Sequence, residues 1–259
     1  MGHVEQSRLP KTKPYEDVLR TVRHGAHAPQ VAAMVVRAVL AALQHAKDDP
    51  GVLATVRLLV DLPRLARAED AVARLRERLP GLPAEFGLAQ FLAAALDALD
   101  AAAPPTDLGE MARTAAVETL ARAVGPALHA LFDPGPDGLV EGLARLKTVA
   151  RFGELMSHFY GRLVAKALHY VASRALAEEV GPGTRFRTLA DERAFNSAMG
   201  DYCRDCAAAV AAYAGEWLSK HDYESGGVIS DREVEGFAAF ALDKLTRRLL
   251  RAEGASRAA

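Results

Sequence analysis

Residues 146–171 read LKTVARFGELMSHFYGRLVAKALHYV, and their periodicity is the strongest indication of the fold class. Apolar residues recur at helical spacing along the stretch, which at about 100° per residue places them on one face of a helix. The opposite face carries basic or titratable residues at spacings of 4, 7, 4, 4 and 3, here named the cationic stripe: Lys147, Arg151, His158, Arg162, Lys166 and His169. The pattern predicts one long amphipathic helix with a cationic back.

The rest of the chain extends this helical pattern. Apolar residues at helical spacing predict helices over 15–24, 29–46, 51–61, 66–79, 84–102, 107–131, 138–179, 189–221 and 231–253. Pro and Gly clusters separate these ranges, because proline cannot donate a helical hydrogen bond and glycine accepts the left-handed C-cap. Asp107 with Glu110, and Ser230 with Glu233, have the spacing of capping boxes. No segment alternates with the period of a strand, so we expect an all-α fold.

A dense cluster of helix breakers at 132–138 divides the chain into halves of different composition. We expect a flexible N-terminal arm over 1–14 and an Ala/Leu-rich array of short antiparallel helices over 15–132. Most aromatic residues follow the cluster, and large rings bury the most area per residue. The range 138–254 is therefore predicted to be an aromatic-rich bundle of three long helices. The sequence leaves open whether the two halves are one domain or two.

Charge and apolar patterning restrict the environment of the protein. The chain has 32 Lys+Arg against 33 Asp+Glu, so any electrostatic recognition must be local. No apolar run supplies the roughly 20 residues that span a bilayer, and the polar N-terminus lacks the apolar core of a secretory signal. Only two cysteines occur, too few for a disulfide framework. We expect a cytoplasmic protein with no membrane partner.

The segment around the cationic stripe is net positive within a neutral protein, which makes it the best candidate for a binding site. Its arginines and lysines could contact phosphates or an acidic protein surface. The predicted residues for an anionic partner are Lys147, Arg151, Arg162, Lys166, Arg185 and Arg187. The alternative is a solvated helix face that binds nothing.

Two other residue groups resemble reactive sites. Cys203 and Cys206 form a CxxC pair within a predicted helix, but no second pair exists to complete a zinc site, so we expect two core residues. Glu154, His158 and His221 are candidate ligands of a helical-bundle metal site.

No nucleophile or phosphate-binding motif is present, and we predict no catalytic residue, no metal and no cofactor. Trp217 and its aromatic neighbours Tyr213, Phe237 and Phe240 could line a ligand pocket, although an aromatic core is the favoured interpretation.

These observations favour a non-catalytic function. We expect an adaptor or structural subunit that binds other protein subunits in a larger, bacterial-type assembly. The first alternative is an accessory subunit that contacts the nucleic-acid backbone through the basic helix face at 147–169. The second is a helical-bundle metalloprotein.

Overall fold

The computed structural model describes residues 13–125, 135–224 and 228–256, and every regular element in these ranges is an α-helix. The first half comprises α1 (Lys13–Arg23), α2 (Ala28–His45), α3 (Pro50–Leu65), α4 (Ala71–Arg78), α5 (Leu88–Ala102) and α6 (Asp107–Val124). The second half comprises α7 (Gly135–Arg145), α8 (Val149–Ala177), α9 (Leu189–Glu224) and α10 (Asp231–Ser256). The all-α prediction is confirmed. The predicted N-terminal arm lies outside the described residues, apart from its last two, which begin α1.

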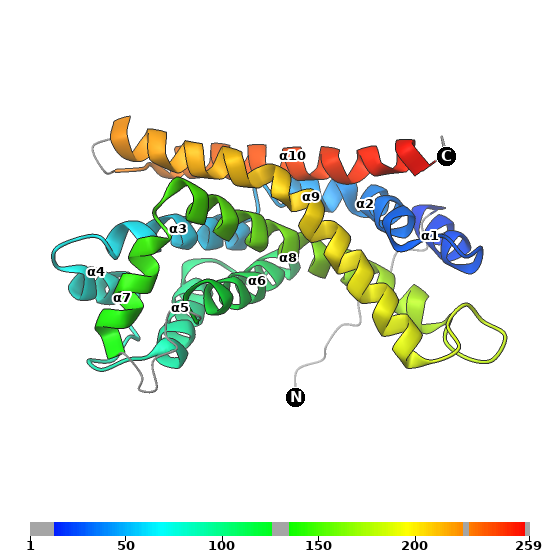
Figure 1. Cartoon of the computed structure of the whole chain (residues 1–259), viewed down its shortest axis with the longest axis horizontal. Coiled ribbons are helices and arrows are strands. Elements are labelled where there is room, and N and C mark those ends of the chain that lie inside the picture. The colour runs from blue at the N-terminus through cyan, green and yellow to red at the C-terminus, as the bar shows by residue number, and fades with distance from the viewer. Residues whose placement is uncertain (1–12, 126–134, 225–227, 257–259) are drawn as a thin grey trace.

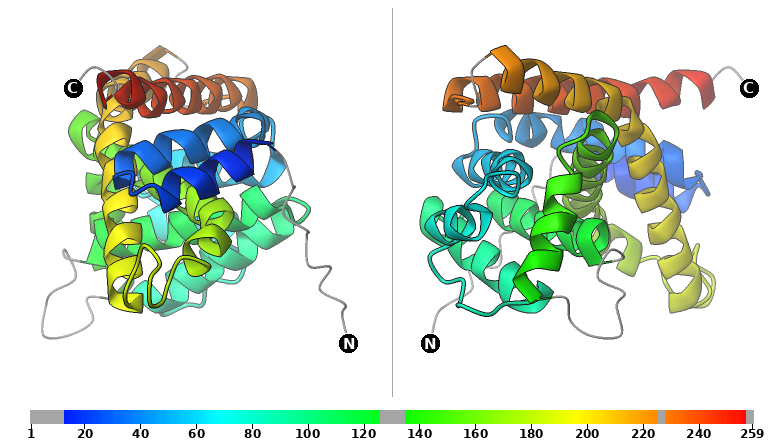
Figure 2. Two further views of the ribbon diagram at one scale, coloured as in Figure 1. Left: turned by 90° about the vertical axis from the view of Figure 1, so that its right-hand side faces the viewer. Right: turned by 60° about the vertical axis from the view of Figure 1, so that its left-hand side comes forward.

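Helix α8 packs most extensively against α9, and it also contacts α6, α2 and α1. Figure 1 shows α10 along one edge of the molecule, where it packs against α2 and α9, and α4 to α7 on the other side. Figure 2 shows α1 and α2 lying side by side, and these two helices contact each other. Within the described ranges, none of the helices combines the length and the hydrophobicity that a membrane span requires.

The prediction of one helix over 138–179 is wrong, because a turn interrupts the helix between α7 and α8. Thr148 begins α8: its carbonyl oxygen accepts from the Phe152 amide at 2.8 Å, and its hydroxyl accepts from the Arg151 amide at 3.4 Å. Threonine is a favoured N-cap because its side-chain oxygen satisfies an amide that the helix leaves free. Lys147, the first residue of the cationic stripe, therefore lies in a turn and not on α8.

Local capping sets the other helix starts. The capping box at α10 is confirmed, since the Glu233 carboxylate accepts from the Ser230 amide at 2.7 Å and the Ser230 hydroxyl accepts from the Glu233 amide at 3.4 Å. The box predicted at Asp107 is wrong by one residue. Thr106 is the N-cap of α6, and its hydroxyl accepts from the Gly109 amide at 2.9 Å. Either residue type can cap a helix, so spacing alone did not distinguish them.

Helices α8 and α9 run antiparallel at very close range. A Cβ atom added to Gly153 of α8 would collide with the backbone of Ala211, and one added to Gly215 of α9 would collide with the backbone of Val149. Only glycine permits such an approach between two helix backbones. We refer to this contact as the glycine seam. It sets the spacing between α9 and the stripe residues that α8 carries, from Arg151 onward.

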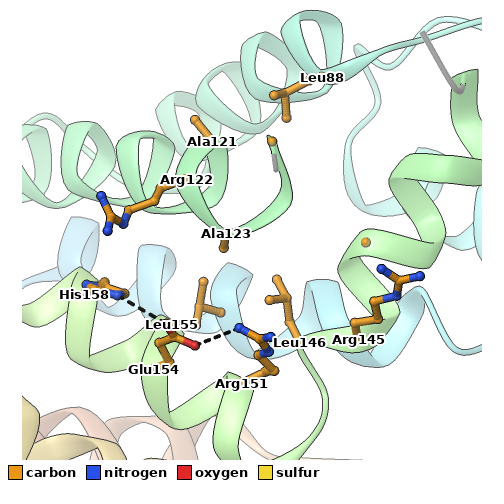
Figure 3. A pocket seen from close by; sticks show the side chains of 12 residues that line it. Leu88, Ala121, Arg122, Ala123, Arg145, Leu146, Arg151, Glu154, Leu155 and His158 are labelled. Atoms are coloured by element: carbon orange, nitrogen blue, oxygen red, sulfur yellow. Dashed lines mark hydrogen bonds and ion pairs between the residues drawn. The ribbon is translucent and has the colours of Figure 1, made fainter. Parts of the chain in front are cut away.

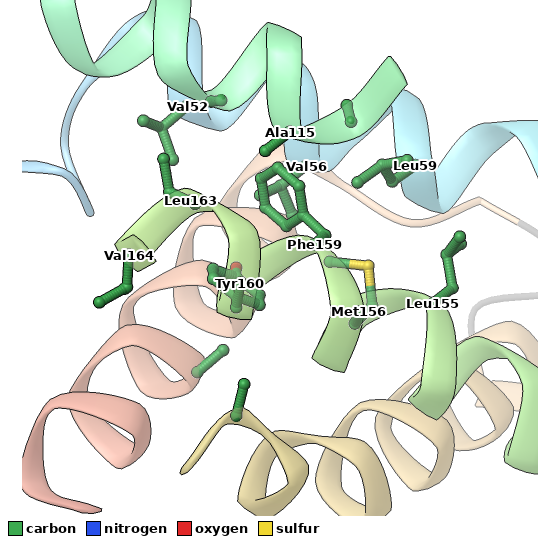
Figure 4. Packing of buried hydrophobic residues seen from close by; sticks show 14 of the residues in the cluster. Val52, Val56, Leu59, Ala115, Leu155, Met156, Phe159, Tyr160, Leu163 and Val164 are labelled. Atoms are coloured by element: carbon green, nitrogen blue, oxygen red, sulfur yellow. The ribbon is translucent and has the colours of Figure 1, made fainter. Parts of the chain in front are cut away.

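One hydrophobic core runs through both halves of the chain. Figure 4 shows Phe159 of α8 close to Val56 of α3 and Ala115 of α6, and all three residues are buried. Buried residues of both halves belong to a single cluster. Residues of both segments therefore contribute to one hydrophobic core.

An ion-pair network joins the two halves at one end of α3. The Asp61 carboxylate is surrounded by three guanidinium groups, from Arg57, Arg64 and Arg78. Arg64 also contacts Asp222 of α9 at 3.0 Å, and Asp222 accepts from Lys147 at 2.7 Å. Burial opposes ionisation of Asp222, but the hydrogen bonds and charges of Lys147 and Arg64 outweigh it and lower its pKa. We call this set the Asp61 network.

Candidate anion-binding groove

Each residue of the cationic stripe lines a hollow in the protein surface. Arg151 and His158 line a pocket of about 1000 Å³ between α6, α7 and α8, here called the basic pocket. Arg162, Lys166 and His169 line a pocket of about 560 Å³ between α6, α8 and α9, here called the mixed pocket. Lys147 lines a third, of about 450 Å³, next to Asp222. We refer to the basic pocket and the mixed pocket, which both lie between α6 and α8, together as the groove; Lys147 lies outside it, beside α9.

The basic pocket has charged sides and an apolar base. Figure 3 shows Arg122 of α6 and His158 of α8 facing each other at one end, Arg145 of α7 at the other, and Arg151 with Glu154 between them. The apolar residues of the lining are Leu88, Ala121, Ala123, Leu146 and Leu155. The lining contains three arginines and one carboxylate, so it favours an anionic occupant.

The cations of the basic pocket differ in how far they are already paired. Arg145 contacts Glu141, and Arg151 contacts Glu154 at 3.1 Å. Both guanidinium groups remain more than half exposed, so the pairs leave donors free for a ligand. Arg122 makes no ion pair or hydrogen bond within the described parts of the chain. It is the cation of this pocket that is most available to a partner.

The pKa of His158 reflects the positive charge around the basic pocket. Burial lowers the pKa of His158 most, and the positive charges of Arg162 and Arg122 lower it further. Glu154, whose carboxylate lies 3.7 Å from the His158 Nε2 atom, opposes this shift only in part. The imidazole is therefore neutral at pH 7, because neighbouring cations disfavour a further positive charge.

In the mixed pocket, one carboxylate is shared by two stripe residues. Glu118 of α6 lies 2.7 Å from the Lys166 ammonium group and 3.6 Å from the Arg162 guanidinium group. Arg162 also donates to the Thr119 hydroxyl at 3.2 Å. These contacts join α6 to α8 and use part of the positive charge that the sequence assigned to a partner.

The remaining predicted binding residues lie apart from the groove. Arg185, in the loop after α8, donates to the carbonyl oxygens of Val22 and Ala26, and its guanidinium group lies 4.6 Å from the centre of the Phe195 ring. These contacts anchor the loop to the turn between α1 and α2. Arg187 is exposed and lines none of the three pockets. The six predicted residues thus occupy several places, not one site.

Arg122 was missed by sequence reasoning, although it faces the stripe. It follows Glu118 by four residues on α6, so the two side chains share one face of that helix. That spacing was a usable signal, but nothing in the sequence indicated that this face of α6 would pack beside α8. Helix pairing, not local pattern, brings the two charged faces together.

The predicted metal ligands do not form one group. Glu154 and His158 are neighbours, but His221 lies on α9, where its ring is 4.6 Å from that of Trp217 and its Nδ1 atom is 2.8 Å from the Trp217 carbonyl oxygen. Among the described residues, no group of three or more His, Cys, Asp or Glu side chains could hold a metal ion.

The cysteines and the aromatic cluster belong to the core, as predicted. Cys203 and Cys206 are buried and unbonded to each other, and burial together with the nearby Cys206 raises the pKa of Cys203 to about 12. Trp217 and Phe237 pack with ring centres 4.5 Å apart, and both are buried. Phe240 is the exception, because about half of it remains exposed.

The chain matches no protein family model, no curated protein and no solved structure. The groove must therefore be interpreted from its own geometry and charge.

Proposed function

We propose that this protein is a non-catalytic helical adaptor, which binds another protein subunit in the groove between α6 and α8. The observation that carries the proposal is the pair of pockets that form the groove, whose linings combine Arg and Lys side chains with apolar residues. Protein interfaces combine an apolar centre with a polar rim in this way. The cytoplasmic location and the bacterial-type assembly expected from the sequence are part of the same proposal.

Contact with nucleic acid is the alternative, and the charge pattern of the groove argues against it. Glu118, Glu154 and Asp222 lie within ion-pair distance of stripe residues. A phosphate backbone that followed the stripe would meet these carboxylates at intervals, and each would oppose binding. A protein surface can place its own cations opposite them.

A pull-down of the tagged protein from its own host, with and without nuclease, tests the proposal. Wild type is compared with Arg122→Glu in the groove and with Arg251→Glu, a matched exposed arginine near the end of α10. We expect a protein partner that survives nuclease, is lost with Arg122→Glu and is retained with Arg251→Glu. Partners that disappear with nuclease would support the nucleic-acid alternative. Equal capture by both variants would place the contact elsewhere and contradict the proposal.

A further inference from the structure

We propose that the basic pocket binds an acidic segment, rich in Asp and Glu, of the partner protein, and that protonation of His158 strengthens this binding. The inference rests on the proposed adaptor function and names the chemistry that the groove recognises. Four observations support it: the distribution of the cations, their unused hydrogen-bonding capacity, the apolar base and the position of His158.

The cations are distributed along the pocket rather than gathered at one point. Arg122 and Arg145 belong to different helices and lie towards opposite ends, with Arg151 between them (Figure 3). A single phosphate would be held by guanidinium groups that converge on one centre. Spaced cations instead fit a ligand that carries several separate negative charges, as a run of Asp and Glu side chains does.

The arginines retain the donors that such a ligand needs. Arg122 has no ion-pair partner among the described residues, and the side chains of Arg145 and Arg151 are 61% and 65% exposed. A guanidinium group has five N–H donors, and one carboxylate uses two of them at most. Each arginine can therefore hold its present partner and a carboxylate of the ligand together.

The base of the pocket suits a polypeptide. Leu88, Leu146 and Leu155 line it from α5, from the turn before α8 and from α8 itself. Apolar contact with the methylene groups and backbone of a peptide would exclude water from the ion pairs, which strengthens them.

His158 links binding to pH. The charged or titratable groups that face it are Glu154 and Arg162 of its own helix and Arg122 of α6. Burial and the two arginines lower the pKa of His158, so the free pocket contains a neutral imidazole at pH 7. Carboxylates of a bound segment favour the imidazolium and raise that pKa. Affinity must then increase as the pH falls from the bound-state pKa towards the free-state pKa, and level off below it.

Fluorescence anisotropy with a labelled Glu/Asp-rich peptide tests the inference on the full chain. The controls are a Gln/Asn peptide of equal length and a labelled short DNA duplex. We expect the acidic peptide alone to bind, and Arg122→Ala to weaken it by about two- to fivefold, the range for exposed ion pairs. Arg251→Ala should leave the affinity unchanged. Circular dichroism melts establish that each variant is folded.

The pH arm compares wild type with His158→Gln between about pH 5.5 and about pH 8, where Asp and Glu remain ionised. Wild type should bind more tightly at the acidic end, and His158→Gln should show a flatter profile. Identical profiles would overturn the role of His158.

Three outcomes would overturn the acidic-segment inference: binding of the Gln/Asn peptide as tight as that of the acidic one, tighter binding of the duplex, or unchanged affinity in Arg122→Ala. Each leaves the pull-down result intact. Absence of any groove-dependent partner in the pull-down contradicts the proposed function, whatever the peptide does.

Discussion

Tyr160 carries a hydroxyl group that the folded protein does not satisfy. The residue is fully buried on α8, its ring packs 4.9 Å from that of Phe159, and its oxygen has no hydrogen-bond partner among the described residues. Burial raises the pKa of Tyr160, which keeps the hydroxyl neutral. An unpaired buried hydroxyl lowers stability because it loses its hydrogen bonds to water.

Replacing Tyr160 by Phe should therefore stabilise the protein. Tyr160→Phe removes the unpaired oxygen and keeps the ring, so we expect the free energy of unfolding to rise by about 1 kcal/mol. The matched change Tyr202→Phe should lower it by about 1 kcal/mol, because the Tyr202 hydroxyl donates to the Leu249 carbonyl oxygen at 3.2 Å. Urea unfolding monitored by circular dichroism measures both. A loss of stability in Tyr160→Phe would indicate an unrecognised partner for its hydroxyl.

Glu154 supplies the carboxylate in the lining of the basic pocket. Its carboxylate neutralises Arg151 and repels an acidic ligand. Glu154→Gln should therefore tighten binding of the Glu/Asp-rich peptide, by about two- to fivefold for an exposed pair. Anisotropy titrations at low and high salt measure the change, and it should shrink at high salt because screening weakens both effects. Weaker binding in the variant would mean that Glu154 orients Arg151 for the ligand.

At the level of elements, the glycine seam determines how closely α8 and α9 can pack. Gly161 continues it, since a Cβ atom there would lie 3.2 Å from the Ala207 side chain and from the Arg204 backbone. Small residues on both helices allow this approach over several turns. The close contact also brings Arg204 of α9 to the mixed pocket, opposite Arg162.

Alanine at the seam should separate the two helices. Gly153→Ala must displace the Ala211 backbone, so we expect a loss of about 1–3 kcal/mol in the free energy of unfolding, typical of overpacking. Gly236→Ala on α10 is the matched control: its added Cβ meets no atom within 4 Å, and alanine favours helix over glycine by about 1 kcal/mol. That variant should be more stable than wild type. Thermal unfolding distinguishes the two, and equal effects would show that the seam tolerates a Cβ atom.

Helix positions were largely predictable from the sequence, because apolar periodicity and Pro/Gly breakers act locally. The interruption of the helix before α8 was not predictable, because the helical spacing of apolar residues continues through Thr148. The seam was not predictable either. Gly153 and Gly215 are unremarkable within their helices, and they acquire a role only when α8 and α9 pack against each other.

For the whole molecule, the Asp61 network and the shared core connect two halves that differ in composition. The network reaches from α3 and α4 to α9 and to the turn before α8, so it crosses the cluster of breakers at which we placed a boundary. The candidate site was predictable only in part, because some of its ion pairs also join residues that are distant in the sequence. The stripe residues and the pairing of Glu154 with Arg151 on the same helix could be identified locally, but Glu118 and Asp222 become partners of the stripe only through tertiary packing.

Acid should weaken this connection through Asp222. Its pKa is lower in the folded chain than the ordinary value of 3.8, so its ionisation stabilises the fold above that value. The contribution is lost as the pH falls through the folded-state pKa. Asp222→Asn should lower the free energy of unfolding by about 2 kcal/mol at pH 7, the range for hydrogen bonds to charged groups. Urea titrations from about pH 7 to about pH 3 should show a flatter acid limb in the variant. Parallel curves would exclude Asp222 as a source of acid sensitivity.

Trp217 provides an internal optical probe of the contact between α9 and α10. It is the sole tryptophan of the chain, it is 7% exposed, and it packs on Phe237 of α10 and on the His221 ring. Its emission therefore originates from one known location. Separation of α10 from α9 would expose the indole to water and shift the emission to longer wavelength, whereas a ligand confined to the groove beside α6 would leave the spectrum unchanged. Fluorescence can thus separate opening of the bundle from occupation of the groove in one unlabelled sample.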